Sequence, residues 1–480
     1  MKLTALPLRP RWSWPLALLA ITILALALRW NYVSTAMVLQ PVRGDATQYF
    51  AYAWNLAQHA TFAKDAPGAS ALHPDNYRDP GYPLFLAFWM KWMGSGNAWY
   101  AAVLLSQALL SALAVTLVTQ LGRHWLPPRW AFVAGLLMAV WPHSITIDSF
   151  LLSETLFGFL CALASLICAQ AIQRDSQPRA VVAGFVFGMA ALTNAMLLPF
   201  GVLLALFLRW RKLARSGICI GLAVGCMVLP GAWAIRNGQI PPPSADSSSL
   251  ARALQNFEQG SWPGFGPAWR ASAIGNPVAR VQARSTLEKV DAEYHLFRSE
   301  PKQGAAAVVR RFTTHPLDYT RWYLIEKPAL LWGWSIEIGQ GDIYVFPTVN
   351  SPFQHRPAWI ALEAICQALT LPLLLLALAS LVLTWPARRS LAILGNPQRR
   401  AVLVSTLVLA GFVTIVYSTL QAEPRYSIPF RPFEILLAIT PLWAVSVWWR
   451  SNRQKVAGHA STSSQPNLQR SASVKPVAES

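Results

Sequence analysis

Long runs of apolar residues recur along this 480-residue chain. Many of them reach the length at which a helix crosses a bilayer, which is about 20 predominantly apolar residues for a hydrocarbon core about 30 Å thick. Only 13% of the residues are charged, against about 25% in soluble globular domains. These features exclude a cytosolic protein, a disordered chain and a small disulfide scaffold. We expect an all-α, polytopic membrane protein.

About ten membrane-spanning helices are predicted, to within about two. The pair 180–193 and 196–208 is short and is compatible with a tilted or re-entrant hairpin around Asn194. The segment 83–93 is too short to span and is expected to lie at the membrane surface. We expect the first helix to be retained, because its apolar stretch is long for a signal peptide and Arg29-Trp30 is typical of an interfacial anchor. The predicted spans are 12–31, 99–121, 130–147, 150–172, 180–193, 196–208, 216–236, 358–384, 401–420 and 428–449.

The net charge of +19 is concentrated in a few short segments. The N-terminus, the loops near 123–129, 174–179, 209–215 and 388–400, and the tail from Arg450 hold 20 basic and two acidic residues. Short cytoplasmic loops of membrane proteins carry such an excess of Lys and Arg. Both termini are therefore expected in the cytoplasm. No basic and aromatic stripe accompanies these loops, so nucleic-acid binding is not predicted.

The same topology divides the chain into four parts. Residues 1–236 form an N-terminal membrane module with a first outer loop at 32–98, and 237–357 form an outer loop region. Residues 358–449 are C-terminal membrane helices, and 450–480 are a cytoplasmic tail with a composition typical of disorder. Within the outer loop region, a spacer at Pro241–Ser244 is followed by predicted helices near 277–298 and 303–313.

No cofactor is predicted. The five cysteines all fall in predicted helices and the eight histidines are scattered, so neither a disulfide framework nor a metal-ligand cluster is indicated. The chain has no GxxxxGK[ST] sequence and no GxGxxG that follows a strand, so nothing supports ATP-driven transport.

Asp45 is the sharpest candidate for chemistry. It lies in Gly44-Asp45-Ala46, shortly after the first helix on the outer side. A carboxylate at the membrane surface can act as a general base for a hydroxyl group. The alternative is an N-cap, because Asp is a favoured cap and a helix over 46–58 is plausible.

Glu154 is a second candidate, close to the outer end of the fourth predicted helix. Ionisable groups within membrane helices usually face polar cavities. The alternative is a helix N-terminal carboxylate favoured by the macrodipole, an interpretation that fits nearby Asp148 equally well.

Two outer turns supply candidate phosphate ligands. Arg78 lies in the rigid turn Tyr77–Pro83, which leads into an apolar segment and suits a lipid phosphate. Its alternative is an ordinary interfacial arginine. Arg425, in the turn between the last two predicted helices, is placed to reach the same anionic site. Its alternative is a surface ion pair with Glu423, which would contribute under about 1 kcal/mol.

These motifs resemble the GT-C superfamily of integral-membrane glycosyltransferases, of the protein O-mannosyltransferase and lipid A aminoarabinose transferase type (glycosyltransferase family 39 type). The matching pieces occur in family order: Gly44-Asp45, Tyr77–Pro83, Leu152–Phe157 and Arg425–Phe430. The resemblance spans about 12–449, whereas the outer loop region at 237–357 is poorly matched.

The resemblance implies a role for each matching residue. Asp45 would be the catalytic base and Glu154 a second catalytic carboxylate at the acceptor or sugar. Arg78 and Arg425 would bind the donor phosphate. Substrate-binding positions would be Asp79, Tyr82 and Tyr426.

Two departures from the family pattern matter. Relatives often carry two adjacent acidic residues in the first loop, whereas Asp45 is followed by Ala46. Relatives that bind a metal often have an acidic residue before the basic one, and here that position is Tyr77. We therefore predict no obligatory metal.

The predicted function is an inverting transfer of a monosaccharide from a polyprenyl-phosphate donor to an acceptor hydroxyl on a glycan, lipid A or a protein. The expected location is the bacterial inner membrane, with membrane lipids as partners and the active site on the periplasmic face. The competing interpretations are a polymerase or ligase of lipid-linked glycans, which would use a diphosphate donor, and a secondary transporter. A transporter would have repeated halves, and no internal repeat is evident.

Overall fold

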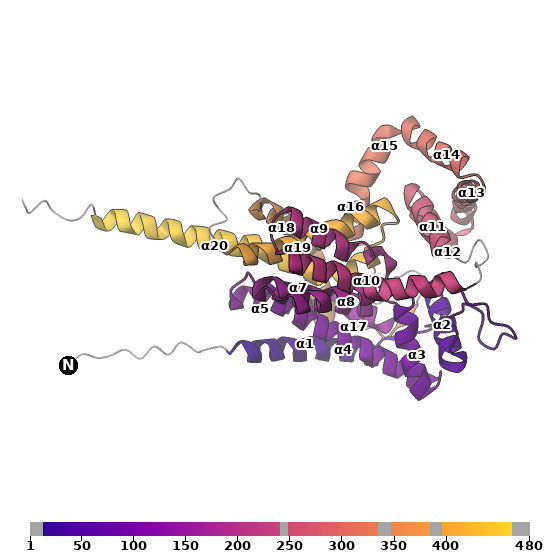
Figure 1. The fold of residues 1–480 in the computed structure, drawn as a ribbon, viewed down its shortest axis with the longest axis horizontal. Helices are drawn as coiled ribbons and strands as arrows, with labels where there is room; N and C mark the ends of the chain where they lie inside the picture. Colours follow the sequence, from indigo (N-terminus) through magenta and orange to yellow (C-terminus); the bar gives the residue numbers. More distant parts are fainter. Residues whose placement is uncertain (1–12, 241–247, 335–346, 385–395, 463–480) are drawn as a thin grey trace, which may run out of the picture.

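The computed structural model describes residues 13–240, 248–334, 347–384 and 396–462, and this part of the chain is almost entirely helical (Figure 1). Outside these residues lie the predicted Pro241–Ser244 spacer and most of the predicted tail, including Arg470 and Lys475. The same holds for five basic residues of the charge count, three near the N-terminus and two in the loop near 388–400: Lys2, Arg9, Arg11, Arg388 and Arg389.

The helices form a membrane bundle with a group of shorter helices at one end (Figure 1). The elements before the outer loop region are α1 Trp14–Thr35, α2 Asp45–His59, α3 Gly81–Met93, α4 Asn97–Gly122, α5 Pro128–Val140, α6 Pro142–Thr146, η1 Ile147–Ser149, α7 Glu154–Arg174, α8 Gln177–Thr193, η2 Ala195–Leu197, α9 Phe200–Trp210 and α10 Ser216–Gln239. Those after it are α18 Pro357–Thr384, α19 Pro397–Thr419, η5 Pro424–Phe430 and α20 Arg431–Thr462.

The described residues hold fewer candidate spans than the ten predicted. Within the described residues, seven helices are long and apolar enough to cross a membrane, or eight if the bent pair formed by α5 and the segment Pro142–Ser149 is one span. That pair bends by 57°, where Pro142 cannot continue the hydrogen bonding of α5. The other two predicted spans correspond to α8, with 17 residues, and α9, with 11. At 1.5 Å per residue both are shorter than the hydrocarbon core.

Side-chain contacts define the two ends of the bundle. At the end we call the basic end, Trp14 donates to Gln120 over 2.7 Å, and Arg215 pairs with Asp175. At the opposite end, the site end, Asn194 donates to Tyr417 over 3.2 Å. Figure 1 shows the start of α1 and the end of α20 on the same side of the bundle, away from α2, α3 and α11–α14.

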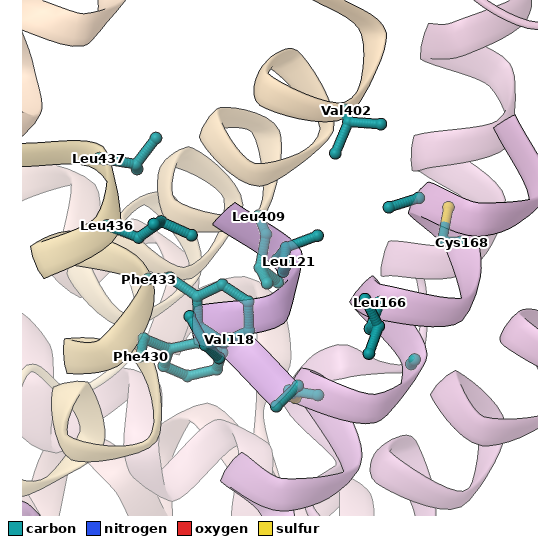
Figure 2. Close-up of a cluster of buried hydrophobic side chains, with 14 of the residues drawn as sticks. Val118, Leu121, Leu166, Cys168, Val402, Leu409, Phe430, Phe433, Leu436 and Leu437 are labelled. Atoms are coloured by element: carbon teal, nitrogen blue, oxygen red, sulfur yellow. The ribbon is translucent and has the colours of Figure 1, made fainter. Parts of the chain in front are cut away.

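The core of the bundle is a continuous set of apolar side chains from α1, α4, α5, α7–α10 and α18–α20. Figure 2 shows its centre, where α4 and α7 face η5, α19 and α20. The labelled side chains there are Val118, Leu121, Leu166, Cys168, Val402, Leu409, Phe430, Phe433, Leu436 and Leu437. All five cysteines are buried and free, in agreement with their predicted helical positions.

Small residues allow α8 and α10 to approach closely. A Cβ atom on Gly184 would lie 2.2 Å from the carbonyl oxygen of Leu222, and one on Gly225 would lie 2.1 Å from that of Val181. Helices in membranes associate through such small-residue surfaces, because lipid is as apolar as the side chains. This contact fixes α8 and therefore the position of Asn194, where α8 ends.

The outer loop region is helical at both predicted positions. Helices α13 and α14 match the predictions near 277–298 and 303–313. A two-stranded antiparallel pairing, Met37 with Val349 and Val38 with Thr348, joins this region to the segment after α1. Its elements are α11 Ser249–Ser261, α12 Phe265–Ile274, α13 Pro277–Ser299, α14 Pro301–Thr314, α15 Pro316–Arg321, the π-helix η3 Trp322–Glu326, α16 Lys327–Trp332, β1 Met37–Val38, β2 Thr348–Val349 and α17 Pro352–His355.

Two local expectations differ from the structure. Arg29, predicted as an interfacial anchor, is completely buried and pairs with Asp148. Asp148 therefore neutralises a charge inside the bundle. Helix α20 continues to Thr462, into the segment from Arg450 that was predicted to be a disordered tail.

Candidate active site

Asp45 begins helix α2 at the site end of the bundle. The preceding Gly44 has φ 57°, a left-handed backbone conformation that glycine adopts without steric cost. Gly44 is the N-cap, and Asp45 is the first residue of the helix. The carboxylate of Asp45 accepts hydrogen bonds from Arg78 and Arg425, with Nη2 to oxygen distances of 2.7 Å in both cases. The alternative that Asp45 is the N-cap is therefore wrong.

Arg78 extends across the start of α2 from the turn before α3. Its Nε donates to Gln48 Oε1 over 2.5 Å, and its guanidinium lies 5.1 Å from the ring centre of Tyr49. Only 13% of its side chain is exposed. The turn is held by Asp75, which accepts hydrogen bonds from the backbone N–H groups of Lys64 and Tyr77. Together these contacts orient the guanidinium group of Arg78 toward Asp45 and the cavity.

Arg425 approaches Asp45 from the turn between α19 and α20. Its Nε lies 3.3 Å from Glu154 Oε1, so one guanidinium contacts two carboxylates. Glu154 is the first residue of α7 and is buried. It combines both interpretations offered above, since it lies in the first turn of a helix and also faces a polar cavity. Arg425 is only 18% exposed and contacts Asp45 and Glu154, so it is not a plain surface residue.

Asp79 and Tyr426 lie beside this cluster. Asp79 accepts both hydrogen bonds of the Nη2 group of Arg252, at 3.0 and 2.9 Å, and one from the backbone N–H of Ala195 at 3.1 Å. The ring of Tyr426 stacks on that of Tyr417, with centroids 4.8 Å apart. Both Asp79 and Tyr426 line the cavity described below.

The structure does not bring Tyr82 into the cavity. Its side chain is completely buried, and its hydroxyl group donates to Gln107 over 2.7 Å. The Tyr82 ring packs edge-on against Tyr49, with centroids 5.1 Å apart. The prediction that Tyr82 binds substrate is therefore corrected: it supports Tyr49, which in turn lies against Arg78.

A cavity of about 1060 Å³ connects these residues. Its walls come from α2, the turn at 77–79, the start of α7, the 193–196 segment, α11, α12 and the 417–426 segment. The cavity holds Asp45, Arg78, Asp79, Glu154, Arg425 and Tyr426, which is every predicted site residue except Tyr82. It is at the upper end of the usual size of ligand pockets, about 300–1,000 Å³.

The two arginines set the charge state of Asp45. Burial alone would raise the pKa of its carboxyl group, but the charges and hydrogen bonds of Arg78 and Arg425 outweigh burial and hold the pKa well below its usual range. The pKa of Arg78 is raised, because the attraction of Asp45 outweighs the effect of burial. Counted with both carboxylates ionised, the cluster of Asp45, Glu154, Arg78 and Arg425 is neutral. An incoming phosphate would compete with the carboxylates for the guanidinium groups.

Among the residues that the structure describes, no group of three or more His, Cys, Asp or Glu side chains is placed to hold a metal ion. The charged groups that converge on the cavity are instead alternating guanidinium and carboxylate groups. The guanidinium groups suit an anionic ligand such as a phosphate, and the carboxylates can accept hydrogen bonds from hydroxyl groups attached to it.

Sequence reasoning missed several residues of the cavity. Arg252 and the amide side chains of α11 belong to the outer loop region, where the family resemblance was weakest. Tyr49 and Tyr417 look like ordinary apolar-face aromatics in the sequence. Asn194 could have been identified from the sequence, because it is a polar residue between two short apolar runs. It lines the cavity beside Tyr417.

Residues 73–233, about a third of the chain, match the family described as Dolichyl-phosphate-mannose-protein mannosyltransferase. The matched segment contains the Tyr77–Pro83 turn and the Leu152–Phe157 motif, and it confirms the resemblance that the motifs predicted. No curated protein matches the chain.

Two similar solved structures are of the oligosaccharyltransferase from Archaeoglobus fulgidus. The apo form has a TM-score of 0.50 and 14% identity, and the match covers 96% of this chain and 53% of that one. The form tethered with an acceptor peptide containing the NVT sequon has a TM-score of 0.50 and 14% identity, over 96% and 52%. This chain thus spans about half the length of that enzyme. At this identity the likeness shows the fold alone, and the expected all-α GT-C type of fold is confirmed.

A third structure is ArnT from Cupriavidus metallidurans bound to undecaprenyl phosphate. It has 14% identity and a TM-score of 0.35, over 85% of this chain and 77% of that one.

Proposed function

We propose that this chain, whose residues 73–233 carry the sequence of a mannosyltransferase family, transfers a monosaccharide from a polyprenyl phosphate to an acceptor hydroxyl group. The observation that carries the proposal is the contact of one carboxylate, Asp45, with two arginines from opposite ends of the sequence. The family match and the fold support the same class of reaction.

The donor phosphate binds to Arg78 and Arg425. Guanidinium groups form paired, charge-assisted hydrogen bonds with phosphate oxygens. Both side chains are held near the cavity by second contacts, Arg78 by Gln48 and Arg425 by Glu154. The polyprenyl tail remains in the bilayer beside the site end, and the sugar enters the cavity.

Donor binding also activates Asp45. In the resting site both guanidinium groups stabilise its ionised form, which makes it a weak base. When the phosphate draws these groups toward itself, the carboxylate loses part of that stabilisation and its proton affinity rises. The base therefore becomes effective only when the donor is in place, which limits reaction with water.

The transfer is a direct displacement. Asp45 takes the proton of the acceptor hydroxyl, and the acceptor oxygen forms a bond to the anomeric carbon. The bond from that carbon to the phosphate oxygen breaks, and polyprenyl phosphate leaves with the electron pair, its charge stabilised by Arg78 and Arg425. A single displacement inverts the anomeric configuration. Glu154 positions Arg425 and lies where it can accept a hydrogen bond from the sugar or acceptor.

We place the cavity on the periplasmic side of a bacterial inner membrane. The turns at the basic end hold Arg123, Arg174 and Arg209–Arg215, and both ends of the described chain lie on that side. The bias of basic residues toward cytoplasmic loops supports this orientation.

The test is release of free polyprenyl phosphate by purified protein supplied with polyprenyl-phosphate sugars and envelope extract. We expect release by the wild type and by Asp318→Asn, which makes the same change on an exposed helix, but not by Asp45→Asn. Equal release by Asp45→Asn would refute the assignment of the base. Release from diphosphate-linked oligosaccharides alone would instead indicate the polymerase or ligase.

A further inference from the structure

The outer part of the cavity carries a row of unused amide groups. Helix α11 presents Gln255, Asn256 and Gln259 to the cavity, together with Arg252 on the same face, since residues three, four and seven positions apart share a helix face. The three amide side chains are half-buried. None of these side-chain amides has a hydrogen-bond partner within the part of the chain that the structure describes.

Helix α11 is fixed at both ends over the cavity. Near its start, Arg252 is bound to Asp79. Near its end, Gly260 lies so close to the next segment that a Cβ atom there would be 1.8 Å from the carbonyl oxygen of Leu420. The buried ammonium group of Lys327 donates to the carbonyl oxygens of both Gly260 and Leu420. The amide row is therefore held in a defined position and is not a mobile surface.

This row is adjacent to the candidate reaction centre. Arg252 binds Asp79, the neighbour in sequence of Arg78, and Arg78 binds Asp45. Asp45 and α11 line the same cavity, so a molecule lying along α11 can extend toward Asp45. The cavity volume of about 1060 Å³ leaves room for a second ligand beside a donor sugar.

The chemistry of this face selects a class of molecule. Each amide side chain offers two donors and one acceptor, which matches hydroxyl groups, since these both donate and accept. The three amides carry no charge, so they give no preference for a phosphate or an ammonium group. The half-buried indole of Trp269 lines the same cavity from α12 and offers a flat apolar surface next to polar groups, as the two faces of a sugar ring require.

We infer that α11 and Trp269 form the acceptor subsite and that the acceptor is a carbohydrate, bound through its hydroxyl groups by Gln255, Asn256 and Gln259. This inference rests on the proposed function, because it names the acceptor of that reaction. A site built to hydrogen-bond hydroxyl groups discriminates strongly against ligands that lack them. The inferred subsite therefore predicts transfer to a glycan or glycolipid and not to a serine or threonine side chain.

The experiment uses the full chain in detergent and a protease-digested envelope extract as the probe. We expect the extract to raise the Tm of the wild type, and to lose this effect after oxidation with periodate, which cleaves the vicinal diols of sugars. The variant Gln255→Leu/Asn256→Leu should lose the Tm shift and show an acceptor KM about tenfold higher. Gln282→Leu, an exposed glutamine on α13, should behave as the wild type.

Binding of undecaprenyl phosphate separates this inference from the proposed function. The double variant should bind that lipid as the wild type does, whereas Arg78→Gln should not. If the lipid binds but the extract has no effect, if the effect survives periodate, or if the double variant keeps it, the carbohydrate subsite is refuted and the donor site stands. If the lipid itself does not bind the wild type, the proposed function fails.

Discussion

Arg29 of α1 and Asp148 of η1 form an ion pair in the interior of the bundle, with Nε 3.5 Å from Oδ2 and no exposed surface on either side chain. Asp148 also accepts a hydrogen bond from Thr155 over 2.7 Å, one residue after Glu154. The first helix is thereby connected to the start of α7, where the second carboxylate of the candidate site lies. Ser111, which accepts from Arg29 over 2.7 Å, completes this buried group.

Removing one member of this pair should destabilise the fold strongly. Arg29→Met leaves the Asp148 carboxylate buried and uncompensated, and loss of one partner of a buried pair costs about 3–5 kcal/mol. The double variant Arg29→Met/Asp148→Asn should recover part of the loss. Thermal unfolding in detergent measures the stability of the single and the double variant. Arg215→Met, which breaks the exposed pair with Asp175, should change stability by under about 1 kcal/mol. Equal losses for Arg29→Met and Arg215→Met would contradict this account.

The carboxylate of Asp45 should stabilise the fold over a defined pH range. Its pKa in the folded protein lies well below its usual range because of Arg78 and Arg425, whereas its pKa in the unfolded chain is about 3.9. The unfolded state binds the proton more readily, so this contribution is present above about pH 4 and is lost as the pH falls toward the folded pKa. The Tm difference between wild type and Asp45→Asn should thus be constant from pH 7 to 5 and narrow below pH 4. A difference that narrows already near pH 6 would show that the two arginines do not hold the carboxylate ionised.

Lys327 predicts a pH dependence of the same sign as Asp45, but over a higher pH range. Burial lowers the pKa of its ammonium group to about 7, against about 10.4 in an unfolded chain. Between these values the unfolded state holds more protons, so stability should rise with pH from about 7 to 10. The variant Lys327→Met should lose this slope when Tm is measured across the range. Lys302→Met, an exposed lysine at the start of α14, should retain it. If Tm still rises with pH in Lys327→Met, another group is responsible for the effect.

Arg252 and Asp79 should be energetically coupled across the cavity. Their side chains are 17% and 19% exposed and share two hydrogen bonds, so a double-mutant cycle of Arg252→Met and Asp79→Asn should give about 1 kcal/mol or more. The exposed pair of Arg321 and Glu326 should give a coupling near zero. Hydrogen exchange of the first turn of α11 should increase in both single variants of the former pair. Coupling no larger than that of the exposed pair would mean that α11 is held by its far end alone.

Much of the site was predictable because its residue types are rare in this chain. With so few charges among so many apolar residues, Asp45, Glu154, Arg78 and Arg425 each stood out, and the structure brings these four together. The helices of the bundle were predictable for the same reason, since long apolar runs fix their existence if not their ends.

The rest depended on contacts between distant segments. Arg252 lies in a polar helix, and nothing near it in the sequence distinguishes it from other loop arginines. Its partner Asp79 lies 173 residues earlier. Arg29 looked like an interfacial residue because nothing near it in the sequence indicates Asp148. The bend after α5 carried a local signal in Pro142, but the apolar run continued across it and favoured one straight span. Tyr82 belonged to a matching motif, yet its ring faces Tyr49 and Gln107.

The distance along the chain between Asp45 and Arg425 has a consequence for biosynthesis. Asp45 and Arg425 are separated by 380 residues, so Asp45 emerges from the ribosome near the beginning of translation and its second partner near the end. Every helix from α1 to α19 is synthesised before the pair can close. A chain that terminates early can therefore insert most of its helices and still lack a finished reaction centre, which makes completion of the last turn the step that converts an inserted protein into an active one.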